Sequence, residues 1–171
     1  MTTQQTCSAI DRTTDAHLVV EMLSQPRYLS GARDLVAAVA KRLGFTDHDC
    51  GQIALAVDEA LCNVIRHGYD RRETEKIWLS IWPVTHDEKS GIRILIEDEA
   101  EQVDPEQIKP RDLDEIRPGG LGVYIIREVM DEARFERRPQ SSVGMRLDMT
   151  KWVRPRTDGP EGPGEGTSRD A

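Results

Sequence analysis

Residues 59–63 read Glu59-Ala60-Leu61-Cys62-Asn63, and they lie inside the run Ile53–Gly68, which has the spacing of a long helix. Four residues make just over one helical turn, so the side chains of Glu59 and Asn63 project from the same helix face. The opposite face carries an apolar stripe, which consists of Ile53, Val57, Leu61 and Ile65. The pattern predicts a helix that packs its back on a core and presents a carboxylate and a carboxamide to a ligand.

These two side chains suit phosphate chemistry. The amide oxygen of Asn63 can ligate Mg²⁺, and the carboxylate of Glu59 can accept a proton or position a water molecule. A solvated helix face would show the same two residues, so their spacing alone leaves both readings open. The neighbouring small residues favour a ligand, because they leave room for close approach; they are Ala54, Ala56 and Ala60.

Two later segments add groups that a nucleotide site would need. Asp98 follows the apolar run at residues 92–96, and a carboxylate there can accept a hydrogen bond from the exocyclic amine of adenine; a strand-ending turn would use the same residue. Gly119-Gly120-Leu121-Gly122 precedes a helical pattern, and glycines at a helix start let the backbone approach phosphate oxygens; a flexible hinge would look alike. The order of these segments after Asn63 indicates a nucleotide site.

Length and composition exclude several other classes of protein. A chain of 171 residues suffices for one domain, and its net charge of −8 argues against a nucleic-acid surface. The cysteines at positions 7, 50 and 62 have no paired spacing, no signal peptide is visible, and no apolar run reaches the length of a membrane span. We therefore expect a reduced, cytoplasmic protein with no membrane contact. The Gly-x₄-Gly-Lys phosphate loop is absent, which excludes a P-loop enzyme.

The hydrophobic pattern predicts a flexible N-terminus at residues 1–15, one folded domain at 16–153 and a disordered Pro/Gly-rich tail at 154–171. The expected strands cover residues 17–23, 76–82, 92–97, 132–138 and 144–153, with a loop at 83–91 and another at 102–118. The expected helices cover residues 26–43, 47–67 and 120–130. The resulting fold class is α/β, a two-layer sandwich whose mixed, mostly antiparallel sheet is covered on one face by about three helices.

The order of Glu59-x₃-Asn63, Asp98 and Gly119-Gly120-Leu121-Gly122 resembles the GHKL (Bergerat-fold) ATP-binding superfamily of gyrases, heat-shock chaperones and histidine kinases. Within it, the phrase Asp58-Glu59-Ala60-Leu61-Cys62-Asn63 through His67-Gly68-Tyr69 is most similar to the anti-sigma-factor serine protein kinases. The likeness covers about residues 17–152. It implies the same two-layer fold and an ATP-binding kinase domain.

The resemblance also implies a role for each motif residue. Asn63 would hold the Mg²⁺ that bridges the ATP phosphates, and Glu59 would be the general base for a serine hydroxyl on a partner protein. Asp98 would bind the adenine amine, with Ala100 beside it. The lid and helix start that wrap the phosphates would come from Gly119, Gly120, Leu121 and Gly122.

Family members phosphorylate a STAS-domain anti-anti-sigma protein, bind a sigma factor and form homodimers, so the resemblance implies these partners here. The sequence departs from the family at Ala100 and Gln102, where two glycines are usual, and at Met145, where a threonine is usual. These changes favour an alternative, a regulatory binding module of the same fold without kinase activity, whereas Glu59 favours a kinase. A detached histidine-kinase domain fits less well, because the chain has no helical hairpin with a phosphoacceptor histidine.

Overall fold

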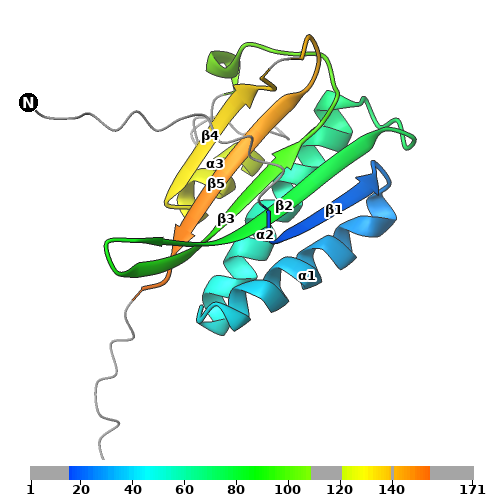
Figure 1. Ribbon diagram of the computed structural model, residues 1–171. Coiled ribbons are helices and arrows are strands. Elements are labelled where there is room, and N and C mark those ends of the chain that lie inside the picture. Colours follow the sequence, from blue (N-terminus) through cyan, green and yellow to red (C-terminus); the bar gives the residue numbers. More distant parts are fainter. Residues whose placement is uncertain (1–15, 109–120, 140, 155–171) are drawn as a thin grey trace, which may run out of the picture.

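Figure 1 shows the computed structural model of the chain, in which residues 16–108, 121–139 and 141–154 are described. The strands are β1 (Leu18–Leu23), β2 (Lys76–His86), β3 (Lys89–Glu97), β4 (Glu132–Arg137) and β5 (Met145–Trp152). The helices are α1 (Leu29–Arg42), α2 (Asp47–Asn63) and α3 (Leu121–Val129), with short turns η1 (Pro26–Tyr28), η2 (Val64–Gly68) and η3 (Pro105–Gln107). The flexible N-terminus expected at 1–15, the glycines at 119 and 120, and the tail from residue 155 onward lie outside the described residues.

The five strands form one sheet in the order β1-β2-β3-β5-β4, and α1, α2 and α3 cover one face of it (Figure 1). This arrangement confirms the predicted α/β two-layer sandwich. Every strand pair in the described part of the chain is antiparallel, so the mixed sheet that we expected contains no parallel pair there.

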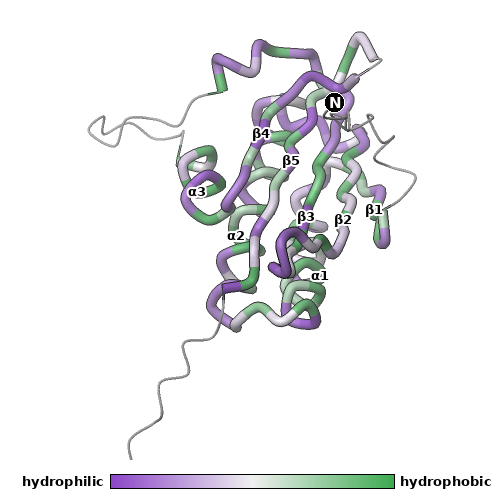
Figure 2. The backbone as a smooth tube through the Cα atoms, turned by 60° about the vertical axis from the view of Figure 1, so that its left-hand side comes forward, coloured by the Kyte–Doolittle hydropathy of each residue, from purple (hydrophilic) through white to green (hydrophobic). Residues whose placement is uncertain are grey.

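The core lies between the sheet and the helices. Alternate residues of β2 and β3 point into it, and the predicted apolar stripe of α2 packs against them. Hydrophilic and hydrophobic sections alternate along strands and helices in Figure 2, as expected of elements with one buried face. The fully buried side chains include Ile53, Val57, Leu61, Ile77, Leu79, Ile81, Ile92, Ile94 and Ile96.

The end of α2 differs from the expected helix. Its start is as predicted, because the Thr46 side chain accepts a hydrogen bond from the Asp49 N–H at 3.1 Å. The α-helical hydrogen bonds stop at Asn63, however, and the chain continues as the π-helical turn η2. The wider turn brings Tyr69 into the core, where its hydroxyl donates to the Lys76 carbonyl oxygen at 2.5 Å.

The prediction of a loop at residues 83–91 is wrong. Strand β2 runs on to His86, β3 begins at Lys89, and a two-residue turn of Asp87 and Glu88 joins them with φ values of 46° and 66°. Pro83 was the expected first residue of that loop. Past Ile81, however, β2 has no partner on the β1 side among the described residues, and such an unpaired section of strand tolerates proline.

Candidate functional site

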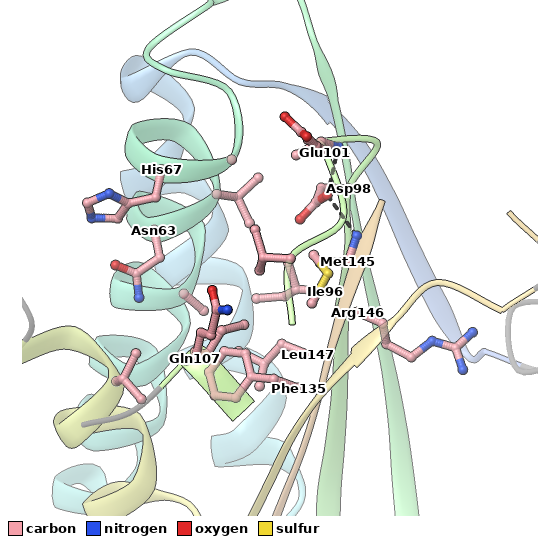
Figure 3. Close-up of a pocket in the computed structure, with 17 residues that line it drawn as sticks. Asn63, His67, Ile96, Asp98, Glu101, Gln107, Phe135, Met145, Arg146 and Leu147 are labelled. Carbon is pink, nitrogen blue, oxygen red and sulfur yellow. Dashed lines mark hydrogen bonds between the residues drawn. The ribbon is translucent and has the colours of Figure 1, made fainter. Parts of the chain in front are cut away.

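A cavity of about 350 Å³ lies between the helix layer and the ends of three strands (Figure 3). Asn63 and His67 approach it from the α2 side, and Asp98 lies at the end of β3. Cavities of this size hold small organic ligands and are mostly apolar. The apolar lining consists of Ala60, Val64, Ile96, Ala100, Val103, Ile108, Val123, Phe135, Met145 and Leu147.

Asp98 supplies a buried acceptor to this cavity. Asp98 is only 4% exposed. Its Oδ1 accepts hydrogen bonds from the N–H groups of Ala100 and Met145, both at 2.9 Å. No hydrogen bond to Oδ2 is found among the described residues. Burial raises the pKa of Asp98, while the two N–H groups act in the opposite direction. Such a carboxylate can select a ligand that offers an N–H donor.

The two residues that replace the family glycines are accommodated by their neighbours. Ala100 is 2% exposed and has no positive φ, so its methyl group costs no backbone strain. A Cβ added at Gly68 would lie 3.1 Å from the Ala100 Cβ, which shows how closely these two segments pack. The side chain of Gln102 donates through Nε2 to the Ser141 carbonyl oxygen at 3.1 Å. Ala100 therefore packs in the cavity wall without backbone strain, and Gln102, which does not line the cavity, is hydrogen-bonded beside it.

Met145 contributes through its backbone. The N–H that reaches Asp98 belongs to this residue, and its side chain lines the cavity (Figure 3). The preceding Gly144 has a φ of 91°, and a Cβ there would collide with the Asp98 carbonyl oxygen. Gly144 N–H also donates to the Ala100 carbonyl oxygen at 2.6 Å. Only glycine fits this close approach of the β4–β5 connection to Asp98.

Glu59 and Asn63 meet the start of α3. A Cβ added at Gly122 would lie 2.8 Å from Oε2 of Glu59 and 3.1 Å from Nδ2 of Asn63. Asn63 lines the cavity, whereas Glu59 lies beside it, next to Gly122. The structure thus brings three of the predicted residues together, with Leu121 54% exposed at the helix start. Gly119 and Gly120, which we also predicted, fall outside the described residues.

The side chains around the cavity can be examined as ligands for a metal ion. Within residues 16–108, 121–139 and 141–154, no group of three or more His, Cys, Asp or Glu side chains could hold one. Mg²⁺ is often held by one or two protein oxygens together with the phosphate oxygens of a nucleotide. The amide oxygen of Asn63, at the cavity edge, fits that kind of binding.

Sequence reasoning missed several residues of the cavity wall. Ile96, Phe135 and Leu147 come from three different strands and meet only in the folded sheet. Strand alternation could have placed each on the helix-covered face, but no local pattern distinguishes a residue that lines a cavity from one in the core. His67, the last residue of the helix expected at 47–67, also lines the cavity (Figure 3). Separately, none of the described helices is both long and apolar enough to cross a membrane.

Comparison with known proteins places this geometry in a family. The family model described as histidine kinase-like ATPase domain matches residues 22–151, which include Glu59, Asn63 and Asp98. The chain therefore belongs to the histidine kinase-like ATPase family of ATP-binding domains, in the branch of the anti-sigma-factor serine protein kinases. This membership confirms the resemblance that the motifs indicated.

The similar proteins carry the name serine-protein kinase RsbW. The Staphylococcus aureus protein is 31% identical over 135 residues, covering 74% of this chain and 80% of its own. The proteins of Oceanobacillus iheyensis and Bacillus subtilis are each 27% identical and cover 80% of this chain, with 87% and 86% of their own length matched.

A solved structure shares the fold. The crystal structure of the RsbU and RsbW domains of a Mycobacterium tuberculosis protein matches with a TM-score of 0.54 and 16% identity. The match covers 81% of this chain and 33% of that one, so this chain corresponds to about a third of the solved structure.

Proposed function

We propose that this protein is an ATP-dependent serine protein kinase and anti-sigma factor, with its ATP-binding domain at residues 16–153. It phosphorylates a STAS-domain anti-anti-sigma protein, sequesters a sigma factor, and acts as a homodimer. The observation that carries the proposal is the meeting of Gly122 with Glu59 and Asn63 beside a cavity that contains the buried Asp98. The names of the similar proteins support the kinase assignment.

In this proposal the cavity binds adenine. Oδ2 of Asp98 accepts a hydrogen bond from the exocyclic amine, while Oδ1 stays bonded to the two backbone N–H groups. Guanine carries a carbonyl oxygen at the equivalent position, so its acceptor would face the carboxylate. A buried acceptor left without its donor disfavours the wrong base strongly, which makes Asp98 a selective group.

The phosphates lie toward Asn63 and the start of α3. Gly122 has no side chain, so the backbone of the helix start can approach them, and its free N–H groups favour anions. Asn63 would hold Mg²⁺ through its amide oxygen. When bound, Mg²⁺ neutralises the charge of the phosphates during transfer.

Glu59 is the general base in this proposal. As the serine oxygen of the partner attacks the γ-phosphorus, its proton passes to the Glu59 carboxylate. The new O–P bond forms while the bond between the γ-phosphorus and the bridging oxygen breaks, and ADP leaves with that electron pair. This role is supported by the position of Glu59 one turn before Asn63 and next to Gly122.

A second candidate function is a regulatory binding module that uses the same fold without phosphoryl transfer. The replacements at Ala100, Gln102 and Met145 favour it, because Gln102 ties its loop to Ser141 instead of leaving it glycine-flexible. In that case nucleotide binding would only set the shape of a partner-binding surface.

A transfer assay separates the two functions. The protein is incubated with radiolabelled ATP, Mg²⁺ and the STAS-domain proteins of the same genome, and Glu59→Gln is compared with the wild type. Asp58→Asn is the matched control, since Asp58 is adjacent but pairs with Arg33 of α1 at 3.7 Å. We expect serine labelling with the wild type and the control and at least a 100-fold lower rate with Glu59→Gln, in line with loss of a general base. Partner binding without labelling by any variant would support the module instead.

A further inference from the structure

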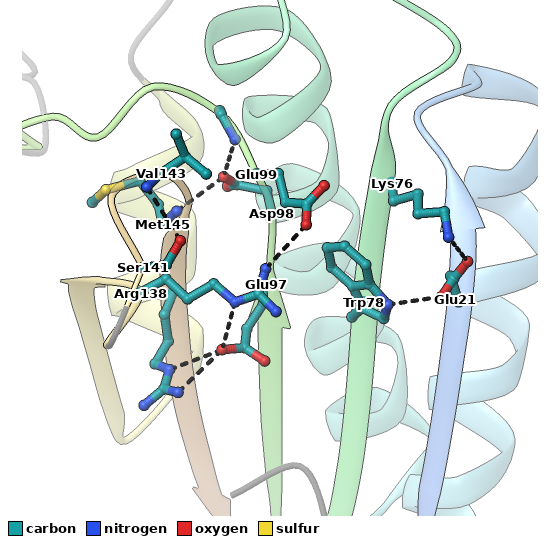
Figure 4. Close-up of polar contacts among 12 residues, drawn as sticks. Glu21, Lys76, Trp78, Glu97, Asp98, Glu99, Arg138, Ser141, Val143 and Met145 are labelled. Atoms are coloured by element: carbon teal, nitrogen blue, oxygen red, sulfur yellow. Dashed lines mark hydrogen bonds and ion pairs between the residues drawn. The ribbon is translucent and has the colours of Figure 1, made fainter. Parts of the chain in front are cut away.

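A group of charged side chains lies directly behind Asp98, on the sheet face that the helices do not cover (Figure 4). Glu97 is only 2% exposed there, and its Oε1 accepts a hydrogen bond from Arg146 Nη2 at 3.1 Å. Arg138 Nε lies 3.9 Å from the same oxygen. A buried carboxylate needs such partners, because an unpaired charge is costly away from water.

Arg138 also reaches the residue on the other side of Asp98. Its Nη1 lies 3.6 Å from Oε1 of Glu99, so one guanidinium joins Glu97 and Glu99. The same guanidinium lies over the ring of Trp78, 5.0 Å from the centroid, which limits its movement. Because successive residues of extended chain point to opposite faces, Arg138 holds both neighbours of Asp98 from outside while Asp98 points into the cavity.

The backbone of Arg138 belongs to the same arrangement. Its N–H donates to the Gly144 carbonyl oxygen at 3.0 Å, and Gly144 N–H donates to the Ala100 carbonyl oxygen at 2.6 Å. The two segments linked in this way provide the N–H groups of Ala100 and Met145 that bind Oδ1 of Asp98. Arg138 thus connects the end of β3 to the β4–β5 connection through its side chain and its backbone.

We propose that Arg138 is a positioning residue for base recognition. By joining Glu97 and Glu99 it fixes the orientation of Asp98, so that Oδ1 stays on the two backbone N–H groups and Oδ2 remains for the amine of adenine. This inference rests on the proposed ATP site. A fixed orientation of Asp98 is needed to discriminate adenine from guanine, and Arg138 provides it through Glu97 and Glu99.

Arg138→Gln tests the inference without stranding a charge. Glu97 keeps its hydrogen bonds to Arg146 Nε and Nη2, at 3.2 and 3.1 Å, so the variant should fold. The control is Arg134→Gln, because Arg134 is an exposed arginine of β4 whose ion partner is Glu132, away from Asp98. Arg138→Lys keeps the charge but loses the planar fork, and we expect it to fall between the wild type and Arg138→Gln.

Two measurements give the readout. The first is amide hydrogen exchange of Ala100 and Met145 in the nucleotide-free protein, with Ile94 of β3 as the internal reference. The second is the ratio of dissociation constants for GTP and ATP. We expect Arg138→Gln to exchange these two amides about tenfold faster and to lose about tenfold in base preference, the size of one lost orienting contact. The ion pair with Glu99 is half-exposed and adds little to global stability, and the buried Glu97 keeps Arg146, so the melting temperature should hardly change.

The outcomes separate the possibilities. Unchanged exchange and an unchanged GTP/ATP ratio in Arg138→Gln would overturn the inference. Uniformly faster exchange of Ile94, Ala100 and Met145, with a lower melting temperature, would show a merely structural role and overturn it as well. A wild type that binds neither nucleotide contradicts the proposed function instead, and the exchange of the Ala100 and Met145 amides then still decides whether Arg138 holds Asp98.

Discussion

Gly122 at the start of α3 lies so close to Glu59 of α2 that a Cβ at residue 122 would come within 2.8 Å of the Glu59 carboxylate oxygen Oε2. The same Cβ would lie 3.1 and 3.3 Å from the two amide atoms of Asn63, the only asparagine in the chain. Residues about 60 positions apart in sequence therefore share one small volume. The groups proposed for proton transfer and Mg²⁺ binding are held there against the backbone proposed to bind phosphate.

Gly122→Ala should separate activity from stability. The methyl group must displace the Glu59 and Asn63 side chains, whose flexible ends can move, so folding is barely affected. Alanine is the better helix former by up to about 1 kcal/mol, and we expect an unchanged or slightly higher melting temperature. A shift of about 1 Å in reacting groups can cost about 100-fold in rate, and we expect a loss of that order.

The control for this variant is Gly51→Ala in α2, where nothing lies within 4 Å of an added Cβ. It should keep full transfer activity. Wild-type activity in Gly122→Ala would contradict the proposed arrangement of the three residues.

Asp98→Asn should weaken ATP binding at least tenfold, because an amide N–H₂ at the Oδ2 position would face the amine of adenine. Oδ1 can still accept the hydrogen bonds from the Ala100 and Met145 N–H groups, so the fold is kept. Isothermal titration calorimetry measures the affinity, with Asp87→Asn in the exposed β2–β3 turn as the control. Equal affinities in Asp98→Asn and the wild type would remove Asp98 from the site.

Asp98 also gives a pH signature. Burial raises its pKa in the folded protein, so the folded state binds the proton more tightly than the unfolded chain. The stability that this proton contributes is fully present below the unfolded pKa and is lost as the pH rises through the raised, folded value. Urea unfolding across mildly acidic pH should show this loss in the wild type and not in Asp98→Asn. If Asp98→Asn were clearly less stable than the wild type at pH 7, the carboxylate of Asp98 would not be destabilised by burial, which would contradict this prediction.

Tyr69→Phe tests the support beneath the Asp98 segment. The Tyr69 hydroxyl accepts a hydrogen bond from the Glu99 N–H at 2.7 Å and donates to the Lys76 carbonyl oxygen at 2.5 Å. Loss of the Tyr69 hydroxyl removes the hydrogen bonds to the Glu99 N–H and the Lys76 carbonyl oxygen, and should lower the free energy of unfolding by about 1–3 kcal/mol. Tyr28→Phe is the control, since Tyr28 is 45% exposed.

The raised pKa of Tyr69 leads us to expect a loss of folding stability at alkaline pH. Burial raises the pKa of Tyr69 from 10.0 to about 12. The contribution of the protonated hydroxyl is complete below about pH 10 and is lost as the pH rises toward 12. Chemical unfolding in this range should show the decline in the wild type, and Tyr69→Phe should lack this component. An identical decline in both proteins would assign it to other groups.

Gly144→Ala and Gly44→Ala form a matched pair, since both glycines have positive φ, at 91° and 97°. Nothing lies within 4 Å of a Cβ at Gly44, so alanine there costs about 1–2 kcal/mol of backbone strain alone. At Gly144 the Cβ meets the Asp98 carbonyl oxygen, and we expect a cost at least about 1 kcal/mol larger, together with weaker ATP binding. Equal melting temperatures for the two variants would show that the β4–β5 connection can move away from Asp98.

Much of this molecule could be predicted from local patterns. The stripe from Ile53 to Ile65 determined which face of α2 is buried, and the spacing of Glu59 and Asn63 placed both on the side that meets α3. Asp98 was identified because it ends an apolar strand. These are short-range features, for which the period of a helix or strand carries the information.

The remaining features depend on contacts between distant segments. The sequence could not show that β2 continues past Pro83, in a section that has no partner on the β1 side among the described residues. Lys151 of β5 is buried, and its Nζ donates to the Val129 carbonyl oxygen and to Asp131, which only the fold brings near. Likewise, Gly144 precedes β5 and Asp98 follows β3, so their contact depends on how these two strands pair.

Calorimetric titration of Mg²⁺-ATP into the wild type and Asn63→Ala measures whether Asn63 anchors the nucleotide in this cavity, with Cys62→Ala as the control from the adjacent helix position. We expect saturable binding to the wild type and to Cys62→Ala, and at least about tenfold weaker binding to Asn63→Ala, since an anchor for the metal and its phosphates is lost. An absence of heat from the wild type at millimolar ATP, or an affinity of Asn63→Ala equal to that of the wild type, would contradict this expectation.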